Sequence, residues 1–181
     1  MSVNRGKSFE GEVQKQLQLL PGISVDRVHD QTNGYKGSSN ICDFIIYKYP
    51  YQYFIECKSV HGNLLSIHSN PKPDKNGVLH GFHGNITDKQ WDGLLEKSLI
   101  PGCVAGVLCW WVDRDITTFL PINMLKDLYD IGDKSVSCYG DWQKYHNDWK
   151  WYHITGNKRR VFFDYDFMRF FENVEREYVN I

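Results

Sequence analysis

Two carboxylates and a lysine stand among apolar residues in the stretch ICDFIIYKYPYQYFIECKS, residues 41–59. The acids are Asp43 and Glu56, and Lys58 follows Glu56 by two positions. Burying a charged group costs free energy unless a partner compensates it. The central proline indicates a turn between two short strands. A buried hairpin that keeps these three charges needs a compensating ligand or partner.

Divalent-metal chemistry supplies such a ligand. Side chains alternate between the two faces of a strand, so Glu56 and Lys58 share one face about 7 Å apart. If the two strands are neighbours, Asp43 lies beside Glu56 on that face. Such carboxylates raise each other's pKa unless a cation lies between them, and oxygen ligands suit Mg²⁺ or Mn²⁺. The metal polarises a phosphoryl oxygen and generates hydroxide, while a lysine orients or deprotonates the attacking water.

The triplet therefore predicts metal-dependent hydrolysis of phosphodiesters. The competing interpretation is an ion pair on an edge strand that faces solvent, because an acid followed by Glu-x-Lys also occurs by chance in many proteins. The apolar character of both strands favours the buried, functional interpretation.

The elements that would position these residues follow from hydrophobic periodicity. Apolar residues at helical spacing predict helices over 7–20, 87–100, 123–130 and near 165–178. Strands are predicted at 23–28, on both sides of Pro50, at 103–112 and at 117–122, the last two as a hairpin. Segment 61–86 is predicted to be a long loop, a feature typical of functional or mobile segments. The alternation indicates an α/β fold with one mixed central sheet flanked by helices.

The length and net charge of the chain limit the possible classes of protein. A chain of 181 residues suits one domain, with a core over about 4–130 and an aromatic-rich C-terminal extension over 131–181. The net charge of −1 gives no global argument for nucleic acid, so DNA binding would use local patches.

The cysteine pattern and the hydropathy of the chain indicate the cellular compartment. The five cysteines include no C-x-x-C pair, which predicts free, buried thiols in a reducing compartment and no zinc–cysteine site. No apolar run approaches the roughly 18 residues of a membrane span, and the first residues lack the apolar region of a signal peptide. We expect a cytoplasmic protein that does not engage a membrane.

Five ordered pieces of sequence resemble a known family. They are NRGKSFEGEV, NGYKGSSNICDF, IECKS, TDKQWDGL and VLCWWV followed by TTFLPINML, and they span about residues 4–128. Together they resemble the RecU-type Holliday junction resolvases, a group that includes smaller phage-encoded relatives. These enzymes belong to the restriction-endonuclease-like nucleases, which share a D…(D/E)-x-K core.

The resemblance implies a restriction-endonuclease-like mixed sheet and Mg²⁺-dependent cleavage of four-way DNA junctions. It also implies a homodimer whose two sites cut opposed strands, in a bacterial cell or a phage-infected host. The implied metal ligands are Glu10, Asp43, Glu56 and the backbone carbonyl of Cys57. Lys58 would serve the attacking water, Gln90 would orient Lys58 or the water, and Arg5 and Lys7 would contact phosphates.

The sequence departs from that family in three ways. Lys89 precedes Gln90, where the cellular enzymes usually have His-Gln-like residues. The cellular enzymes are basic and this chain is not. Their long protruding segment, which enters the junction centre, has no assignable counterpart here; segment 61–86 is one candidate for substrate engagement. Two other functions stay open: a nuclease with the same core that acts on duplex DNA, and a DNA-binding module that does not cleave.

Further residues have competing interpretations. Glu12 rivals Glu10 as the helical ligand, but it falls farther from the apolar stripe, and either acid is otherwise a solvated one. The histidines at 61, 68, 80 and 83 form only a weak zinc pattern, which favours solvent-facing loop histidines. Trp110 and Trp111 are predicted to lie in the core or on a dimer face.

The densest basic run is NKRR, which carries Lys158, Arg159 and Arg160. One interpretation is a solvated turn. The other is a DNA-binding patch that works with Lys144, Lys150 and stacking from Trp149 or Trp151.

Overall fold

The computed structural model describes residues 5–28, 40–67, 72–73, 76–77, 79–80, 84–139 and 152–177. Its centre is a six-stranded sheet in the order β1-β2-β3-β7-β8-β10. These strands are Ser24–Arg27, Phe44–Lys48, Tyr51–Val60, Cys103–Trp111, Ile116–Pro121 and Tyr152–His153. The pair β3–β7 is parallel and the other four pairs are antiparallel. The predicted mixed central sheet is therefore confirmed.

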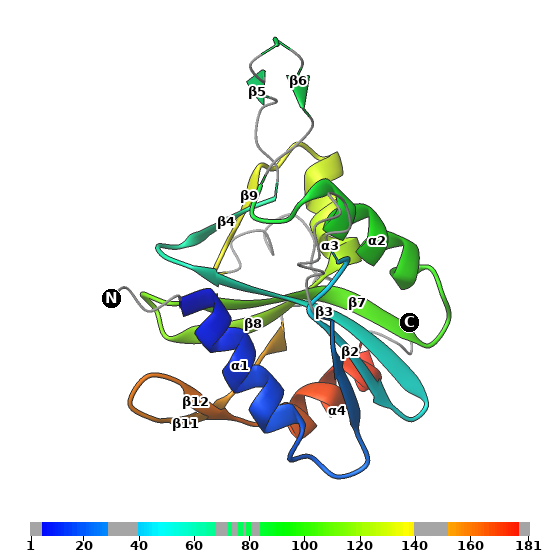
Figure 1. Ribbon diagram of the computed structural model, residues 1–181, viewed down its shortest axis with the longest axis vertical. Coiled ribbons are helices and arrows are strands. Elements are labelled where there is room, and N and C mark those ends of the chain that lie inside the picture. The colour runs from blue at the N-terminus through cyan, green and yellow to red at the C-terminus, as the bar shows by residue number, and fades with distance from the viewer. Residues whose placement is uncertain are drawn as a thin grey trace.

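Four helices cover the two faces of this sheet (Figure 1). Helices α1 (Arg5–Leu17) and α4 (Phe167–Glu177) lie on one face, and α2 (Asp88–Ser98) and α3 (Ile122–Asp130) lie on the other. All four predicted helices are present. The first ends earlier than predicted, because residues 18–20 form a turn rather than another helical turn.

Strand alternation divides the core into two clusters that share the sheet. On β3, Tyr53 and Ile55 pack with the α1 stripe of Phe9, Val13 and Leu17, below the sheet in Figure 1. The intervening Phe54 faces the opposite cluster, which contains Leu94 of α2. Glu56 and Lys58 alternate with Ile55 and Cys57, so they face the α2 side.

The hairpin β2–β3 turns at Tyr49-Pro50, which is a cis peptide. Its register pairs Phe44 with Ile55 and Lys48 with Tyr51. Asp43 immediately precedes β2 and is not part of it, whereas Glu56 and Lys58 lie within β3. The expectation that all three charges sit inside the strands is therefore wrong for Asp43.

Segment 61–86 contains strands, in contrast to the predicted loop. β4 (Leu64–Ser66) pairs with β9 (Ser135–Ser137). β5 (Lys72–Pro73) pairs with β6 (Leu79–His80), and this small ribbon stands away from the body of the molecule (Figure 1). The segment thus carries both a strand that covers the core and a projection.

The C-terminal residues belong to the same core. β11 (Gly156–Lys158) and β12 (Phe163–Tyr165) form a hairpin before α4. Phe167 and Phe171 of α4 and Tyr152 of β10 are buried below the sheet.

Several sequence predictions about burial can be judged in the described part of the chain. Trp110 and Trp111 are buried, which confirms the core interpretation. The five cysteines are free, and four of them are buried. None of the helices in the described ranges is both long enough and apolar enough to span a membrane.

Candidate active site

Asp43 and Glu56 meet where β2 and β3 separate. The last backbone pair of this ladder is Phe44 with Ile55; Asp43 immediately precedes Phe44, and Glu56 immediately follows Ile55. Beyond that pair the Asp43 N–H donates to the Ile55 carbonyl at 3.0 Å, and the Asp43 carboxylate takes the place of a backbone acceptor, since its Oδ2 accepts a 2.7 Å hydrogen bond from the Cys57 N–H. The two acids are therefore neighbours, as the strand alternation predicts.

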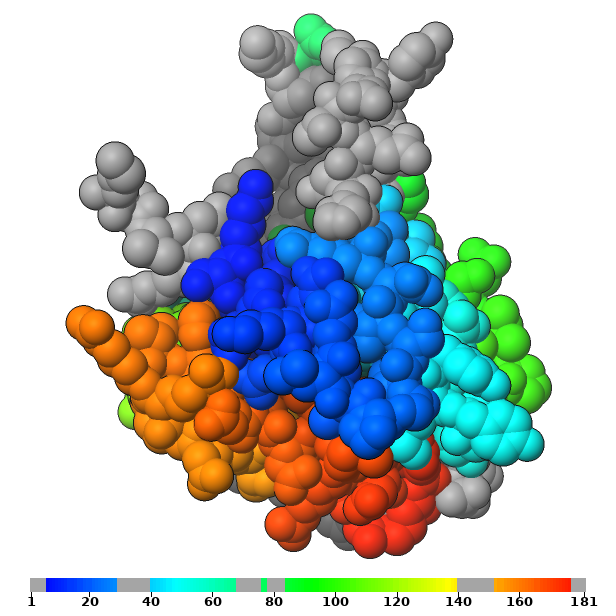
Figure 2. Space-filling model, turned by 60° about the horizontal axis from the view of Figure 1, so that its bottom comes forward, coloured from blue at the N-terminus to red at the C-terminus, as the bar shows by residue number. Residues whose placement is uncertain are grey.

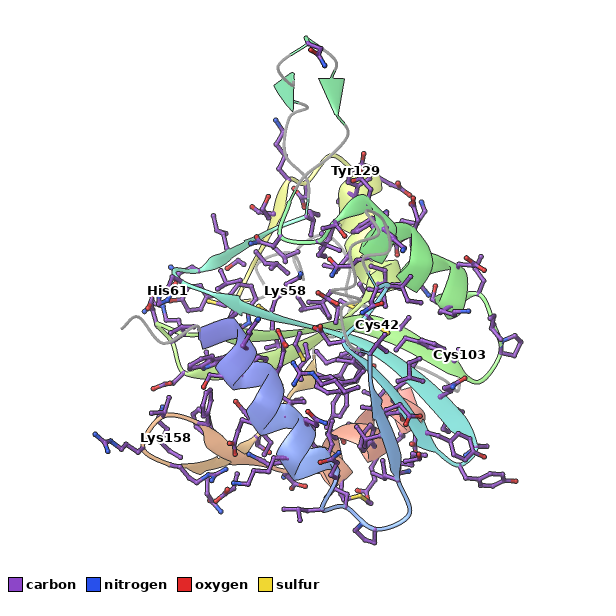
Figure 3. The ribbon with its side chains drawn as sticks, viewed as in Figure 1. Cys42, Lys58, His61, Cys103, Tyr129 and Lys158 are labelled. Carbon is purple, nitrogen blue, oxygen red and sulfur yellow. The ribbon has the colours of Figure 1, made fainter. Side chains whose placement is uncertain are left out.

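Glu56 is almost completely buried, with 3% of its surface exposed. Its Oε1 accepts from Lys58 Nζ at 2.7 Å and from Gln90 Nε2 at 2.6 Å. Burial, and then the charge of Asp43, raise the pKa of Glu56 to about 8, although Lys58 opposes the shift. Lys58 lies above β3, on the α2 side of the sheet (Figure 3).

Gln90 connects the start of α2 to this pair. Thr87 caps the helix in a capping box, in which Thr87 Oγ1 accepts from the Gln90 N–H and Gln90 Oε1 accepts from the Thr87 N–H. The same Oε1 receives a 3.4 Å contact from Lys58 Nζ, while Nε2 donates to Glu56. One amide thus holds both the helix start and the two charged side chains in register.

Glu10 approaches the acids from α1, on the other side of the sheet. Arg27 of β1 donates from Nη2 to Glu10 Oε2 at 2.7 Å and from Nη1 to Gln14 Oε1 at 3.3 Å. Burial and the charge of Asp43 raise the pKa of Glu10, while Arg27 and Lys7 act in the opposite direction. Glu10, Asp43 and Glu56 therefore form one electrostatically coupled set.

Glu12 lies outside that set. Its carboxylate accepts from Gln16 Nε2 at 2.7 Å and pairs with Arg159 of the C-terminal segment. The preference for Glu10 over Glu12 as the helical ligand, made from the helical stripe, stays a prediction.

Arg27 was not singled out by the sequence reasoning. The one local indication is its position two residues after Val25, because residues two apart on a strand share a face. Val25 packs against the α1-side cluster, and Arg27 therefore also faces α1.

The backbone at Cys57 also faces the gap between the strands. Its N–H points to Asp43, and the N–H and C=O of one strand residue leave the same edge, so the carbonyl faces this gap too. Burial raises the pKa of the Cys57 thiol, and it raises the pKa of Cys42 to about 12. Both side chains therefore remain neutral thiols near neutral pH, which disfavours thiolate ligation of a soft metal.

The donor set suits a hard divalent cation in its chemistry and charge. Three carboxylates and a carbonyl offer oxygen ligands, and burial, followed by the charge of Asp43, raises the pKa of both Glu10 and Glu56. Over the described ranges, no three His, Cys, Asp or Glu side chains already stand as a metal-holding group. Arg27 and Lys58 each contact a carboxylate oxygen of the set, so ligation would require these cations to give way.

The residues expected to contact phosphate lie on two separate elements, helix α1 and the β11–β12 hairpin. Lys7 is exposed on α1 and acts electrostatically on Glu10, and Arg5 begins that helix. Lys158 pairs with Asp115 at 2.6 Å, and Arg159 pairs with Asp164 at 2.7 Å as well as with Glu12. Arg160 is exposed. Two of the three basic residues thus hold the hairpin β11–β12 to the protein.

The remaining candidates lie elsewhere or outside the described residues. His61 pairs with Asp113 at 2.9 Å, and His80 is on β6. His68, His83, Lys144, Trp149, Lys150 and Trp151 lie outside the described residues.

The chain was compared with protein families, curated proteins and solved structures. No protein-family model matches the chain, and no curated protein matches it either. A similar solved structure is Archaeoglobus fulgidus Hjc, a Holliday junction resolvase from an archaeal hyperthermophile. The match has 17% sequence identity and a TM-score of 0.46, and it covers 73% of this chain and 86% of that one.

Proposed function

We propose that this protein is a nuclease that hydrolyses DNA phosphodiesters with Mg²⁺ or Mn²⁺. The observation that carries the proposal is the buried carboxylate of Glu56, which lies between Asp43 and Lys58 where β2 and β3 separate. Such an arrangement is costly for a purely structural ion pair, because a buried pair must recover the free energy of desolvation.

Each residue has a distinct role in this proposal. Glu10, Asp43, Glu56 and the Cys57 carbonyl would hold the cation, which would supply Lewis-acid polarisation of the phosphate and an activated water. Lys58 orients the attacking water or accepts its proton. Gln90 holds Lys58 and Glu56 in register, and Lys7 with Arg5 binds neighbouring phosphates.

We infer a four-way DNA junction as the substrate and a homodimer as the active form. The ordered set of motifs from Asn4 to Leu125 supports the junction, and the projecting ribbon β5–β6 is a candidate to enter its centre. The acid cluster, formed by Glu10, Asp43 and Glu56, would serve one strand in each chain, and two symmetric cuts suit a C2 pair. Nuclease action on ordinary duplex DNA is the alternative that the following assay separates.

The test compares a labelled four-way junction with a matched linear duplex, with and without Mg²⁺. We expect metal-dependent cleavage of the junction, and loss of that cleavage in Glu56→Ala and in Glu10→Ala. Glu12→Ala is the matched control, because Glu12 is on the same helix but contacts Gln16 and Arg159 instead of the acid cluster.

Cleavage of the duplex at the same rate would replace junction specificity with general nuclease activity. A Glu56→Ala protein that cuts as well as the parent would overturn the catalytic assignment. If the protein binds the junction but cuts it with neither Mg²⁺ nor Mn²⁺, it is a DNA-binding module and not a nuclease.

A further inference from the structure

A hollow of about 620 Å³ lies at the end of β3, beyond the acid cluster. Its walls are the turn His61–Leu64, which follows β3, and Ser137 with Tyr139 from the end of β9. Lys58 and His61 are three residues apart, or about 10 Å along an extended strand. Figure 3 shows His61 at the end of β3 and Lys58 nearer its middle. A nucleic-acid strand bound at the acid cluster can therefore reach this hollow within a few nucleotides.

Tyr139 presents an aromatic ring to the hollow. The residue is 56% exposed, and the Arg114 guanidinium lies over its ring at 5.3 Å from the centroid. Arg114 is itself fixed by a 2.7 Å hydrogen bond from its Nε to Asn63 Oδ1. One face of the ring is thus supported by a cation. A nucleobase stacks well on an aromatic ring that is already held in place, because little side-chain entropy is lost on binding.

The turn that forms the other wall is also fixed. Asp113 Oδ2 accepts from the Gly62 N–H at 2.7 Å, and Asp113 Oδ1 contacts His61 Nδ1 at 2.9 Å. The Cys138 N–H donates to the Asn63 carbonyl at 2.9 Å and joins this turn to β9. His61 remains 60% exposed at the rim, and the Arg114 guanidinium offers donors to a phosphate there.

A second hollow, of about 290 Å³, has the wrong charge for a DNA strand. It is lined by the aromatic residues Trp91 and Tyr129, but also by Asp88 and Asp92. Two carboxylates repel a phosphodiester backbone. At the β3 hollow the acid Asp113 is engaged by His61, and Arg114 adds a positive charge.

We propose that the hollow at the end of β3 binds an unpaired nucleotide of the DNA strand that leaves the acid cluster. The base stacks on the open part of Tyr139, and Arg114 binds the adjoining phosphate. This subsite rests on the proposed nuclease function for its substrate, and its role is affinity for unpaired DNA rather than the chemical step.

The test measures binding in EDTA, where cleavage does not occur. The probe is a short single-stranded DNA with one fluorescent purine analogue whose emission is quenched by stacking, together with its fully paired duplex. We expect quenching by the parent and by Tyr139→Phe with the single strand. Tyr139→Ala should lose the quenching and bind the single strand about tenfold or more weakly. Tyr49→Ala is the matched control, since Tyr49 is 80% exposed but lies at the opposite end of β3, in the β2–β3 turn.

Thermal melting of Tyr139→Ala should match that of the parent, because the side chain is half exposed. Arg114→Ala, which removes the support of the ring, should weaken binding of the single strand in the same assay. Unchanged quenching and affinity in Tyr139→Ala would overturn the subsite, even if the parent cleaves DNA. A parent that shows the quenching but cuts no DNA with Mg²⁺ would overturn the nuclease alone.

Discussion

Glu56 is the one charged residue in the described part of the chain that is buried in the core. Its ionised form lacks hydration and faces the negative charge of Asp43, so only Lys58 and Gln90 compensate it in the absence of a metal. The folded protein therefore binds the Glu56 proton more tightly than the unfolded chain does. Linkage converts that difference into a dependence of stability on pH.

The replacement Glu56→Gln tests this linkage. A raised folded-state pKa stabilises the fold fully below the unfolded value near 4.5, and that contribution is lost as pH rises toward about 8. In EDTA, we expect the free energy of unfolding of the parent to fall across this window, and the slope to be shallower in Glu56→Gln. Urea denaturation at several pH values measures both slopes. Equal slopes would show that the proton affinity of Glu56 does not change on folding.

The predictable part of the site is the part that depends on local spacing. Glu56 and Lys58 share a face because strands alternate, and Asp43 joins them because a tight turn fixes the register of a hairpin. Arg27 was not predictable from the sequence, because its contact with Glu10 depends on how α1 packs against β1. The pairs that Arg159 makes with Glu12 and Asp164 likewise depend on the docking of distant segments.

At the scale of elements, helix α2 begins at the site itself. The N3 residue of its capping box is Gln90, and the same side chain contacts Lys58 and Glu56. A change to the cap therefore reaches the acid cluster through one amide.

The replacement Thr87→Ala removes the cap acceptor. We expect it to cost about 1 kcal/mol of stability. We also expect it to lower the rate of DNA cleavage under conditions where the variant is fully folded, because the Gln90 backbone N–H loses its acceptor, Thr87 Oγ1, at the helix start that positions the Gln90 side chain. Thr87→Ser keeps the hydroxyl and should retain both properties. Urea denaturation measures the stability, and the junction assay measures the cleavage rate. A Thr87→Ala protein that loses stability but cleaves at the parent rate would show that the helix cap does not affect the site.

Gln16 joins α1 to the β11–β12 hairpin, two elements that lie side by side in Figure 2. Its Nε2 donates to the Phe163 carbonyl at 2.7 Å, and its Oε1 accepts from the Tyr165 N–H at 2.7 Å. In Gln16→Ala both backbone groups lose their partner, which costs about 1–3 kcal/mol when such groups stay desolvated. We expect a lower urea midpoint for Gln16→Ala and little change for Gln18→Ala, whose side chain is exposed. A midpoint equal to the parent's would show that water replaces the two hydrogen bonds.

Strong periodicity explains which elements could be predicted. The apolar stripes of α1 to α4 and the long run of β7 are local patterns, and the structure contains all of them. The strands that were not predicted each have only two or three residues and so carry no readable alternation; they are β4, β5, β6, β9, β10, β11 and β12. Their pairing depends on partners far away in the sequence, as for β4 with β9.

At the scale of the whole molecule, the acid cluster draws on both layers around the sheet. Glu10 comes from α1 below the sheet, Gln90 comes from α2 above it, and Asp43 and Glu56 come from the hairpin between them. Neither layer can separate from the sheet without dispersing the cluster. A ligand of this cluster must therefore stabilise the entire fold, not one segment.

This coupling predicts that Mg²⁺ raises the melting temperature without any DNA. A ligand at one hundred times its dissociation constant adds about 2.7 kcal/mol to the stability of a protein that binds it only when folded. Asp43→Asn should abolish most of the shift, because the amide can still accept from the Cys57 N–H but lacks the negative charge that the cation requires. Glu12→Gln should keep the shift, since Glu12 contacts Gln16 and Arg159 away from the cluster. Thermal melting over a Mg²⁺ titration measures all three proteins, and a shift in Asp43→Asn as large as in the parent would place the cation at another part of the molecule.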